Sequence, residues 1–223
     1  MLVKNRMNAD PVSVSPDDTL AQAHRLTREH RIRHLPVVQG GVLVGILSDR
    51  DVRSAMPSPL ERGDEARAAA VAETPVAQVM TREVITTGPF DTVEDAAKLL
   101  CRHRIGALPV VDAHGRLVGM ISETDVLTAF AEVLSAGGPS SRLEISIQDR
   151  PGALAALLHV LGDELHLNVT SLMVLPRGEG GRKTAIVHVD TIDPREAIAA
   201  LERAGAVVGW PSLEADLRKG MPA

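Results

Sequence analysis

Aromatic residues are nearly absent from this sequence, with two phenylalanines, one tryptophan and no tyrosine among 223 residues. Its cores must therefore be built from Val, Leu, Ile and Ala. Functions that depend on aromatic stacking, such as single-stranded nucleic-acid binding, are disfavoured. A net charge of -5 also gives no basic footprint for nucleic acid or for an anionic membrane surface. We expect neither partner.

Cysteine and long hydrophobic runs are scarce as well. The single cysteine, Cys101, allows no internal disulfide and no thiolate cluster, which favours a reducing, cytoplasmic location. No run approaches the roughly 18 apolar residues that a membrane helix needs, and the first residues lack the apolar segment of a signal peptide. Because the histidines lack the spacing of metal ligands, we expect no metal site.

An internal repeat occupies the first part of the chain. Met7–Val38 lines up without gaps with Met80–Val111, and the match resumes after one extra residue in the second copy. In each copy a hydroxyl N-cap, Thr19 or Thr92, begins a helix with apolar residues at helical spacing. A Leu-Pro-Val-Val strand and a second strand follow across a turn. Each copy therefore predicts the order strand, helix, strand, strand, helix.

Composition divides the chain into two domains. We expect a first domain at 1–134, with repeat one at about 3–55, a linker at 56–75 and repeat two at about 76–134. Glycine, proline and serine at 135–141 indicate a second linker, because these residues contribute little to a core.

Residues 142–223 form the second predicted domain. Apolar and polar residues alternate strictly at 143–147, and a leucine-rich helix follows with Pro151 in its first turn. Further strands at 168–175 and 184–189, separated by a glycine-rich hairpin at 177–181, a helix from Asp193 and a last strand near 206–209 complete a ferredoxin-like order.

The two copies resemble CBS motifs, on the segments Pro-Asp-Asp-Thr-Leu, His-Arg-Ile-Arg-His-Leu-Pro-Val-Val and Gly-Ile-Leu-Ser-Asp-Arg-Asp that end at Asp51, and on residues 89–125. Residues 143–154 resemble the opening of an ACT domain. The combination is similar to the acetoin-utilisation AcuB-type regulatory proteins. It implies an α+β fold, with a CBS pair (a Bateman module) of two β-α-β-β-α repeats followed by a ferredoxin-like βαββαβ ACT domain. Both module types also imply a homodimer.

An adenosine ligand requires an apolar slot for the base, acceptors for the ribose hydroxyls and cations for phosphate. Asp51 and Asp125 each follow a strand at the start of a helix, where a carboxylate can accept from both ribose hydroxyls, and the CBS resemblance implies this role. The alternative is an ordinary helix cap. Further hydrogen bonds are expected from Ser48, Ser122 and Thr124, the slot from Val12, Val14, Leu35, Pro36, Ile85, Leu108 and Pro109, and polar edge contacts from Ser13, Thr86 and Thr87.

The two copies differ where phosphate is expected. The first has Arg33-His34, Arg50 and Arg53, whereas the second has Gly106-Ala107 and Thr124 at the matching places. The resemblance implies phosphate binding by the pair before Leu-Pro, and guanidinium suits that task. We predict a phosphate-binding first site. Two alternatives stay open: Arg33 and His34 reach a ligand held by Asp125, or they are solvated surface cations.

The second domain has a candidate site of its own. By resemblance to ACT domains, Asp149, Gly152, Ala153 and Leu154 can present backbone N–H groups to a carboxylate ligand, with Asn168 opposite. Simple dimer packing of this face is the alternative.

These features predict a regulatory protein that binds an adenosine-containing ligand, of the AMP, ADP, ATP or S-adenosylmethionine class, and acts on a protein partner. A link to acetoin utilisation is implied by architecture alone. A constitutive dimerisation scaffold with vestigial clefts and an amino-acid sensor are the alternatives. Catalysis, for instance of the inosine-monophosphate dehydrogenase type, is not expected, because the two regulatory modules account for the chain and Cys101 has no base beside it. No catalytic residue or catalytic cofactor is assigned.

Overall fold

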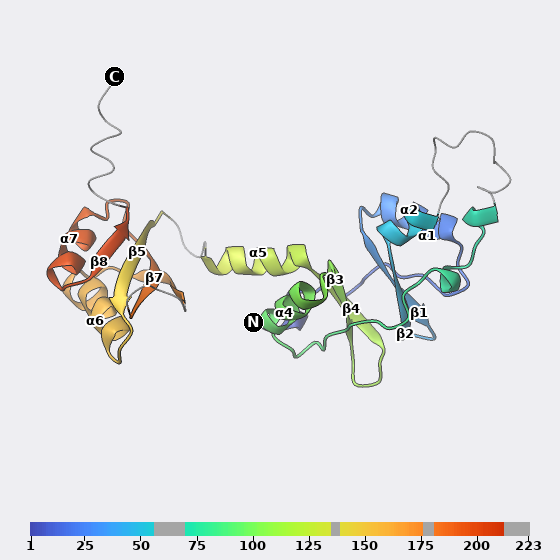
Figure 1. Ribbon diagram of the computed structural model, residues 1–223, viewed down its shortest axis with the longest axis horizontal. Helices are drawn as coiled ribbons and strands as arrows, with labels where there is room; N and C mark the ends of the chain where they lie inside the picture. The colour runs from blue at the N-terminus through green and yellow to red at the C-terminus, as the bar shows by residue number, and fades with distance from the viewer. Residues whose placement is uncertain (56–69, 135–138, 176–180, 212–223) are drawn as a thin grey trace, which may run out of the picture. The chain divides into compact units, whose positions relative to one another are not determined.

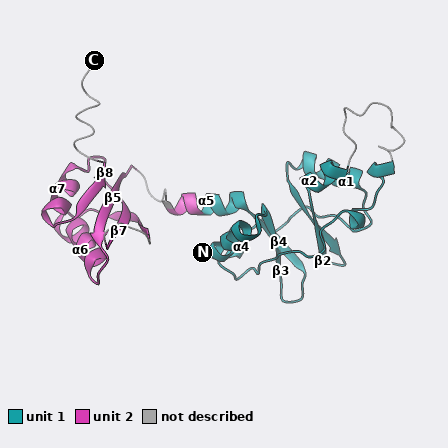
Figure 2. Cartoon of the chain, in the orientation of Figure 1, with its two compact units in different colours: residues 1–129 teal, residues 130–223 magenta. Residues whose placement is uncertain are grey.

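The computed structural model describes residues 1–55, 70–134, 139–175 and 181–211. They belong to two compact units, residues 1–129 and 130–223 (Figures 1 and 2). Most of both expected linkers, and most of the expected hairpin at 177–181, lie outside the described residues. Within them, no helix combines the length and apolar character needed to cross a membrane.

Each repeat of unit 1 contributes a helix, an antiparallel strand pair and a second helix (Figure 1). The expected first strand is reduced in each copy to one residue in a parallel bridge, Val14 to Val37 and Thr87 to Val110. The ladder does not extend because the neighbouring prolines, Pro36 and Pro109 on β1 and β3, have no N–H to donate. The elements are α1 (Leu20–Glu29), β1 (His34–Gln39), β2 (Val42–Ser48), α2 (Asp49–Ala55), α4 (Val93–His103), β3 (Ala107–Val111), β4 (Leu117–Ser122) and α5 (Glu123–Leu134), with short 3-10 turns η1 (Val3–Asn5) and η2 (Val76–Gln78).

Hydroxyl caps begin the first helix of each repeat, as the sequence predicts. Gln22 N–H donates to Thr19 Oγ1 at 3.2 Å while Thr19 N–H donates to Gln22 Oε1 at 2.8 Å, which forms a complete capping box. In the second copy Asp95 N–H donates to Thr92 Oγ1 at 3.0 Å. The hydroxyl of Thr92 in turn donates to Asp95 Oδ2 at 2.8 Å, a variant of the same box.

The lead segments of the two repeats, residues 1–8 and 74–81, are exchanged. Asn8 forms an antiparallel bridge with Met120 of the second repeat, and Thr81 forms the equivalent bridge with Ile46 of the first. Figure 1 shows the N-terminus beside α4, and Val3 N–H donates to Asp91 O at 2.9 Å. The chain then returns to its own repeat at the Val14 and Thr87 bridges, so it crosses between the repeats twice. Local sequence does not reveal this exchange, because the two copies begin alike.

Each repeat therefore has a core completed by the other's lead segment. The core of the first repeat contains Val76 and Met80 together with Leu35 and Leu47. Glycines make the crossing possible: a Cβ on Gly45 would lie 2.5 Å from Met80 Sδ, and one on Gly119 would lie 2.6 Å from Met7 Sδ.

The described strands of unit 2 form one antiparallel sheet of order β6-β7-β5-β8, and helical segments accompany it. Its core combines Leu143 and Ile145 of β5, Val187 of β7, Leu161 and Leu201. The elements are β5 (Ser141–Gln148), α6 (Ala153–His159), the π-helical turn η3 (Val160–Glu164), β6 (Val169–Leu175), β7 (Arg182–Val189), α7 (Arg195–Arg203) and β8 (Val207–Trp210). This is the predicted ferredoxin-like order, and the fold class is confirmed.

One local expectation in unit 2 is wrong. Pro151 does not lie in the first helical turn, because α6 begins at Ala153 and its N-cap is Gly152. Gly152 has a φ of 84°, a left-handed conformation that glycine adopts without a Cβ clash and that separates the proline from the helix.

Candidate functional site

Two pockets open in unit 1 where the chain crosses between the repeats. We name them the Asp51 pocket, with a volume of about 500 Å³, and the Asp125 pocket, with a volume of about 290 Å³. Each combines the strand pair and helix start of one repeat with the crossing segment and the helix-to-strand turn of the other. Small-molecule sites commonly have this size and this mixture of apolar walls and a few polar groups.

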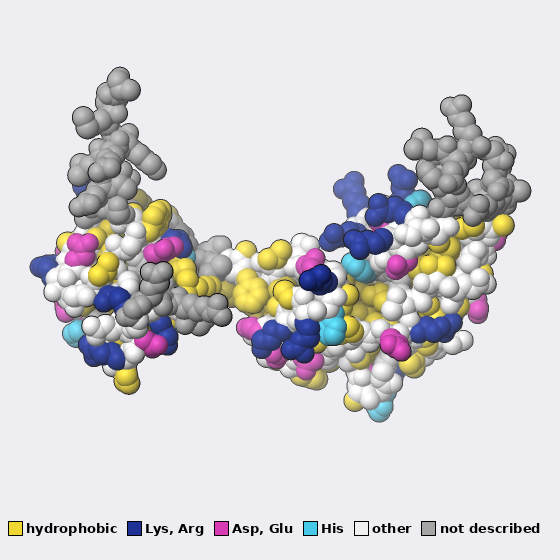
Figure 3. All heavy atoms as spheres, in the orientation of Figure 1, with side chains coloured by type: hydrophobic (Ala, Val, Ile, Leu, Met, Phe, Trp, Pro, Cys, Tyr) yellow, Lys and Arg dark blue, Asp and Glu magenta, His cyan; other side chains and the backbone are white. Residues whose placement is uncertain are grey.

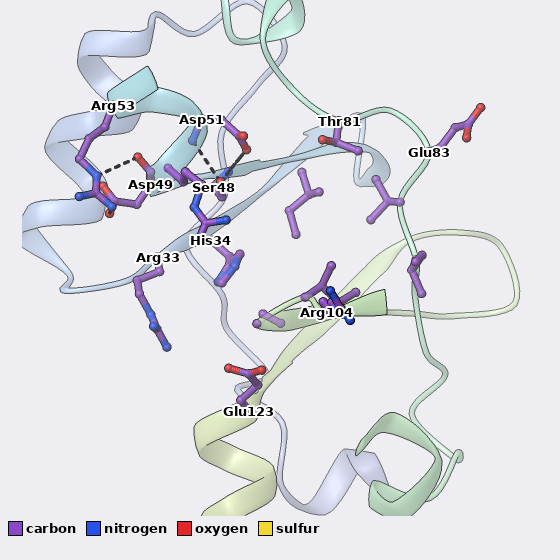
Figure 4. Close-up of a pocket in the computed structure, with 17 residues that line it drawn as sticks. Arg33, His34, Ser48, Asp49, Asp51, Arg53, Thr81, Glu83, Arg104 and Glu123 are labelled. Atoms are coloured by element: carbon purple, nitrogen blue, oxygen red, sulfur yellow. Dashed lines mark hydrogen bonds and ion pairs between the residues drawn. The ribbon is translucent and has the colours of Figure 1, made fainter. Parts of the chain in front are cut away.

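The two aspartates lie in the same local geometry at the start of α2 and α5. Ser48 donates to Asp51 Oδ2 from its N–H at 2.9 Å and from its hydroxyl at 2.6 Å (Figure 4). Ser122 donates to Asp125 Oδ2 at 2.7 Å from both groups. Within the described residues, Oδ1 of each aspartate accepts no hydrogen bond, so this oxygen is available to a ligand hydroxyl. The aspartates thus support a helix start and face a pocket at once.

Part of each apolar wall comes from the repeat opposite to the aspartate. Val84 and Ile85 line the Asp51 pocket, whereas Pro11 and Val12 line the Asp125 pocket. By its place in the sequence, Val12 is expected in the slot of the first copy, with Asp51, and Ile85 in that of the second, with Asp125. The exchange of lead segments reverses this assignment, because residues 9–13 and 82–86 are the crossing segments.

The further predicted contacts fall into two groups, those that line a pocket and those that line neither. The structure brings Arg33, His34, Ser48 and Arg50 to the Asp51 pocket, and Arg33, His34, Ser122 and Thr124 to the Asp125 pocket. Leu35 and Leu108 are fully buried in the repeat cores and line neither pocket. The other predicted residues that line neither pocket are Ser13, Val14, Pro36, Thr86, Thr87 and Pro109; Thr87 instead donates its hydroxyl to Asp91 Oδ2 at 2.9 Å.

Arg33, His34, Gly106 and Ala107 line both pockets and form the wall between them. A Cβ on Gly106 would lie 2.9 Å from His34 Cε1, so the small residue in repeat two accommodates the imidazole of repeat one. Of the alternatives left open by the sequence, the structure therefore supports a position from which the Arg33-His34 pair faces both aspartates.

Burial lowers the pKa of His34 below its ordinary value of 6.5, and the neighbouring Arg33 guanidinium lowers it further. The carboxylates of Glu123, Asp51 and Asp49 act in the opposite direction but do not reverse the shift. The imidazole is therefore neutral near pH 7 and can donate or accept a hydrogen bond at the shared wall.

The Asp51 pocket balances four arginines against four carboxylates. One pair is satisfied internally, since Arg53 binds Asp49 at 2.8 Å. Arg104 lies on the side of the pocket away from Asp49 and Arg53 (Figure 4). Figure 3 shows basic side chains gathered in clusters on one face of unit 1, despite the net negative charge of the chain. The charge on this face of unit 1 thus differs from what bulk composition indicates.

Sequence reasoning missed several pocket residues. They are Ile46, Asp49, Thr81, Glu83, Val84, Arg104, Ile105 and Glu123 in the Asp51 pocket, and Asn8, Pro11, Arg31, Ile32 and Met120 in the Asp125 pocket. The available signal was that Arg31 and Arg104 occupy matching places in the two copies. No group of three His, Cys, Asp or Glu suited to a metal occurs among the described residues.

In unit 2 the predicted ligand loop is largely bonded to its own chain. Asp149 Oδ1 pairs with Lys183 Nζ at 2.7 Å, and Asp149 N–H donates to Gly181 O at 3.0 Å. Ala153 N–H donates to Arg150 O at 3.2 Å. Gly152 caps α6, on which Leu154 lies, and Asn168 N–H donates to Asp190 Oδ1 at 2.7 Å.

Comparison with known proteins decides the family. CBS domains match residues 3–58 and 76–132, and an ACT domain matches residues 141–206. The chain belongs to the CBS-domain family. It is a tandem CBS pair followed by a C-terminal ACT domain. The CBS domain-containing protein YhcV of Bacillus subtilis is 36% identical over 124 residues, which are 56% of this chain and 81% of YhcV.

An enzyme is also among the relatives. Inosine-5'-monophosphate dehydrogenase of Korarchaeum cryptofilum is 33% identical over 211 residues, which are 90% of this chain. The alignment spans only 41% of the dehydrogenase. The activity of the whole enzyme therefore does not transfer with the similarity.

Two solved structures share the fold of the CBS pair. An acetoin utilization protein (AcuB) by name, from Vibrio cholerae, is 30% identical with a TM-score of 0.51 and covers 60% of this chain and 93% of that one. CBSX2, solved in complex with AMP, is 26% identical with a TM-score of 0.51 and covers 60% of this chain and 98% of that one. CBS and ACT domains of this kind are typically regulatory rather than catalytic.

Proposed function

We propose that this protein is a non-catalytic regulator that binds an adenine nucleotide of the AMP class in both CBS pockets. One observation carries the proposal: Asp51 and Asp125 occupy matching places, each with one oxygen held by a serine and the other unbonded among the described residues. A fixed carboxylate with a free oxygen suits a ribose diol. The AMP complex of CBSX2 supports the choice of ligand.

The apolar residues that line the two pockets suit the base. Ile46, Val84 and Ile105 line the Asp51 pocket, and Val12, Ile32 and Met120 line the other. These side chains come from both repeats, so a base in either pocket contacts the whole CBS pair. A ligand then stabilises the packing of the two repeats, as regulation through a partner protein requires.

Isothermal titration calorimetry with AMP tests this function. We expect two sites in the wild type and one in either Asp51→Ala or Asp125→Ala. The lost site weakens about a hundredfold, because two charge-assisted hydrogen bonds are removed. Asp91→Ala is the matched control: Asp91 Oδ2 also accepts from a backbone N–H, that of Gly88 at 2.7 Å, but lies outside both pockets. Binding of AMP that neither alanine alters contradicts the proposal, and no binding at all favours the scaffold.

The pathway, the oligomeric state and the location of the protein rest on other observations than the pockets. The likeness to the Vibrio cholerae protein supports a role in acetoin utilisation, which growth of a deletion strain on acetoin would check. The homodimer, the regulated protein partner and the cytoplasmic location stay predictions from the sequence.

A further inference from the structure

Two arginines occupy equivalent turns between the first helix and the strand pair of each repeat. Both have a left-handed backbone, with φ of 54° at Arg31 and 53° at Arg104. Glycine or asparagine is the usual residue in this conformation, because a Cβ crowds the following carbonyl. Strained non-glycine residues of this kind cluster at binding sites, where the surrounding structure holds them in the strained conformation.

The two side chains line opposite pockets. Arg104 of the second repeat lines the Asp51 pocket, and Arg31 of the first repeat lines the Asp125 pocket. Both arginines are exposed, and neither side chain has an ion pair or hydrogen-bond partner within the described residues. In Figure 4 Arg104 is set apart from Ser48 and Asp51, on the side supplied by the second repeat.

Among the described pocket residues, no other cation has a matching cation in the second repeat. Arg50 is matched by Thr124 in the second repeat, and the counterpart of Arg33 is Gly106. Arg53 is already bound to Asp49. Arg31 and Arg104 alone, among the described pocket residues, give each pocket one unpaired guanidinium at the same place.

We propose that Arg31 and Arg104 bind the phosphate of the ligand, one in each pocket and each from the repeat opposite to the aspartate. A guanidinium can donate two parallel hydrogen bonds to phosphate oxygens, which suits this task. The proposal rests on the proposed function, which places the ribose at the aspartate. It assigns phosphate to both pockets, whereas the sequence analysis placed it at the first site alone.

A purely structural role is the competing explanation, in which the arginines only end their helices. His166 shows that this occurs, because it also has a φ of 53° but lies in unit 2, outside both pockets. Replacement by glycine separates the two explanations. It relieves the backbone strain at all three positions but removes a pocket side chain at only two.

The experiment measures AMP and adenosine affinities by calorimetry, one pocket at a time. Arg104→Gly in an Asp125→Ala background reports on the Asp51 pocket, and Arg31→Gly in an Asp51→Ala background reports on the other. We expect AMP to bind about tenfold more weakly in each, with adenosine unchanged and the melting temperature equal or higher. Arg104→Lys should lose less AMP affinity than Arg104→Gly, because lysine keeps the charge but not the paired donors. His166→Gly should change neither affinity.

Distinct results overturn the two proposals. If glycine leaves AMP affinity unchanged, or weakens AMP and adenosine equally, the arginines do not bind phosphate. A wild type that binds AMP and adenosine with the same affinity also rejects phosphate recognition, yet leaves the nucleoside pockets in place. A wild type that binds neither compound overturns the proposed function itself.

Discussion

His34, which lies in the wall shared by the two pockets, makes the stability of the fold depend on pH. Its pKa is lowered in the folded protein, first by burial and then by Arg33, so on acidification the unfolded chain takes up the proton first. The free energy of unfolding that depends on neutral His34 is fully present at neutral pH, and it is lost as the pH falls below 6.5 towards the lowered pKa of the folded protein. We expect His34→Gln to flatten the decline in melting temperature between about pH 7 and about pH 5. Circular dichroism melts measure this decline.

The control for this prediction is His114→Gln, because His114 is exposed and lies outside both pockets. Equal slopes for the wild type and His34→Gln would show that another group governs stability over this range.

Residue types predicted the polar half of the site better than the apolar half. Asp51 and Asp125 could be placed because a Ser three residues before an Asp, between a strand and a helix, is a local pattern with a local cause. Leu35 and Leu108 could not be assigned correctly, since an apolar residue beside a pocket and one beneath it look alike in sequence. Burial depends on what the rest of the chain covers.

At the scale of elements, β2 and β4 each carry a glycine beneath the lead segment of the other repeat. Gly45→Ala places a methyl group 2.5 Å from Met80 Sδ, and Gly119→Ala places one 2.9 Å from the backbone oxygen of Asn8. Each should destabilise the CBS pair by about 1–3 kcal/mol, the usual cost of overpacking, and Gly119→Ala by more, because backbone yields less than a thioether. Urea unfolding measures the loss.

Gly162→Ala serves as the matched control, since a Cβ there meets nothing within 4 Å and the residue lies in a helical turn. It should be neutral or stabilising. Similar losses in all three variants would mean that crowding by the lead segment is not the cause.

The elements themselves were largely predictable, and their pairing was not. The capping box at Thr19 and the strand pair around Leu35-Pro36 follow from short-range physics. The exchange of lead segments involves Met7 with Gly119 and Met80 with Gly45. A methionine and a glycine recur in each copy, so pairing within a repeat would satisfy the same pattern as pairing between repeats.

At the scale of the whole molecule, the two units have separate hydrophobic cores. Two thermal transitions are therefore expected in differential scanning calorimetry, because residues unfold cooperatively with the core in which they pack, and each unit has its own core. A nucleotide at about a hundred times its dissociation constant should increase the free energy of unfolding of the CBS pair by about 2.7 kcal/mol per site. Only the melting temperature of the CBS pair should therefore rise. The double variant Asp51→Ala with Asp125→Ala should abolish the rise. A ligand that raises both transitions would contradict independent units.

The exchanged lead segments also bear on how such a chain can arise. A polypeptide with one repeat would carry Val3 and Met7, the equivalents of Val76 and Met80, but in this chain those residues pack on the other repeat. A lone repeat folded in this way would therefore need a second copy to complete its core. The two-repeat chain thus has the arrangement of a swapped dimer whose two copies are joined end to end. Each repeat then always has the other's lead segment available to complete its core. Two repeats in one chain can also differ in sequence, whereas two copies of a single repeat cannot. One side of the shared wall can therefore carry Arg33 and His34 while the other carries Gly106 and Ala107.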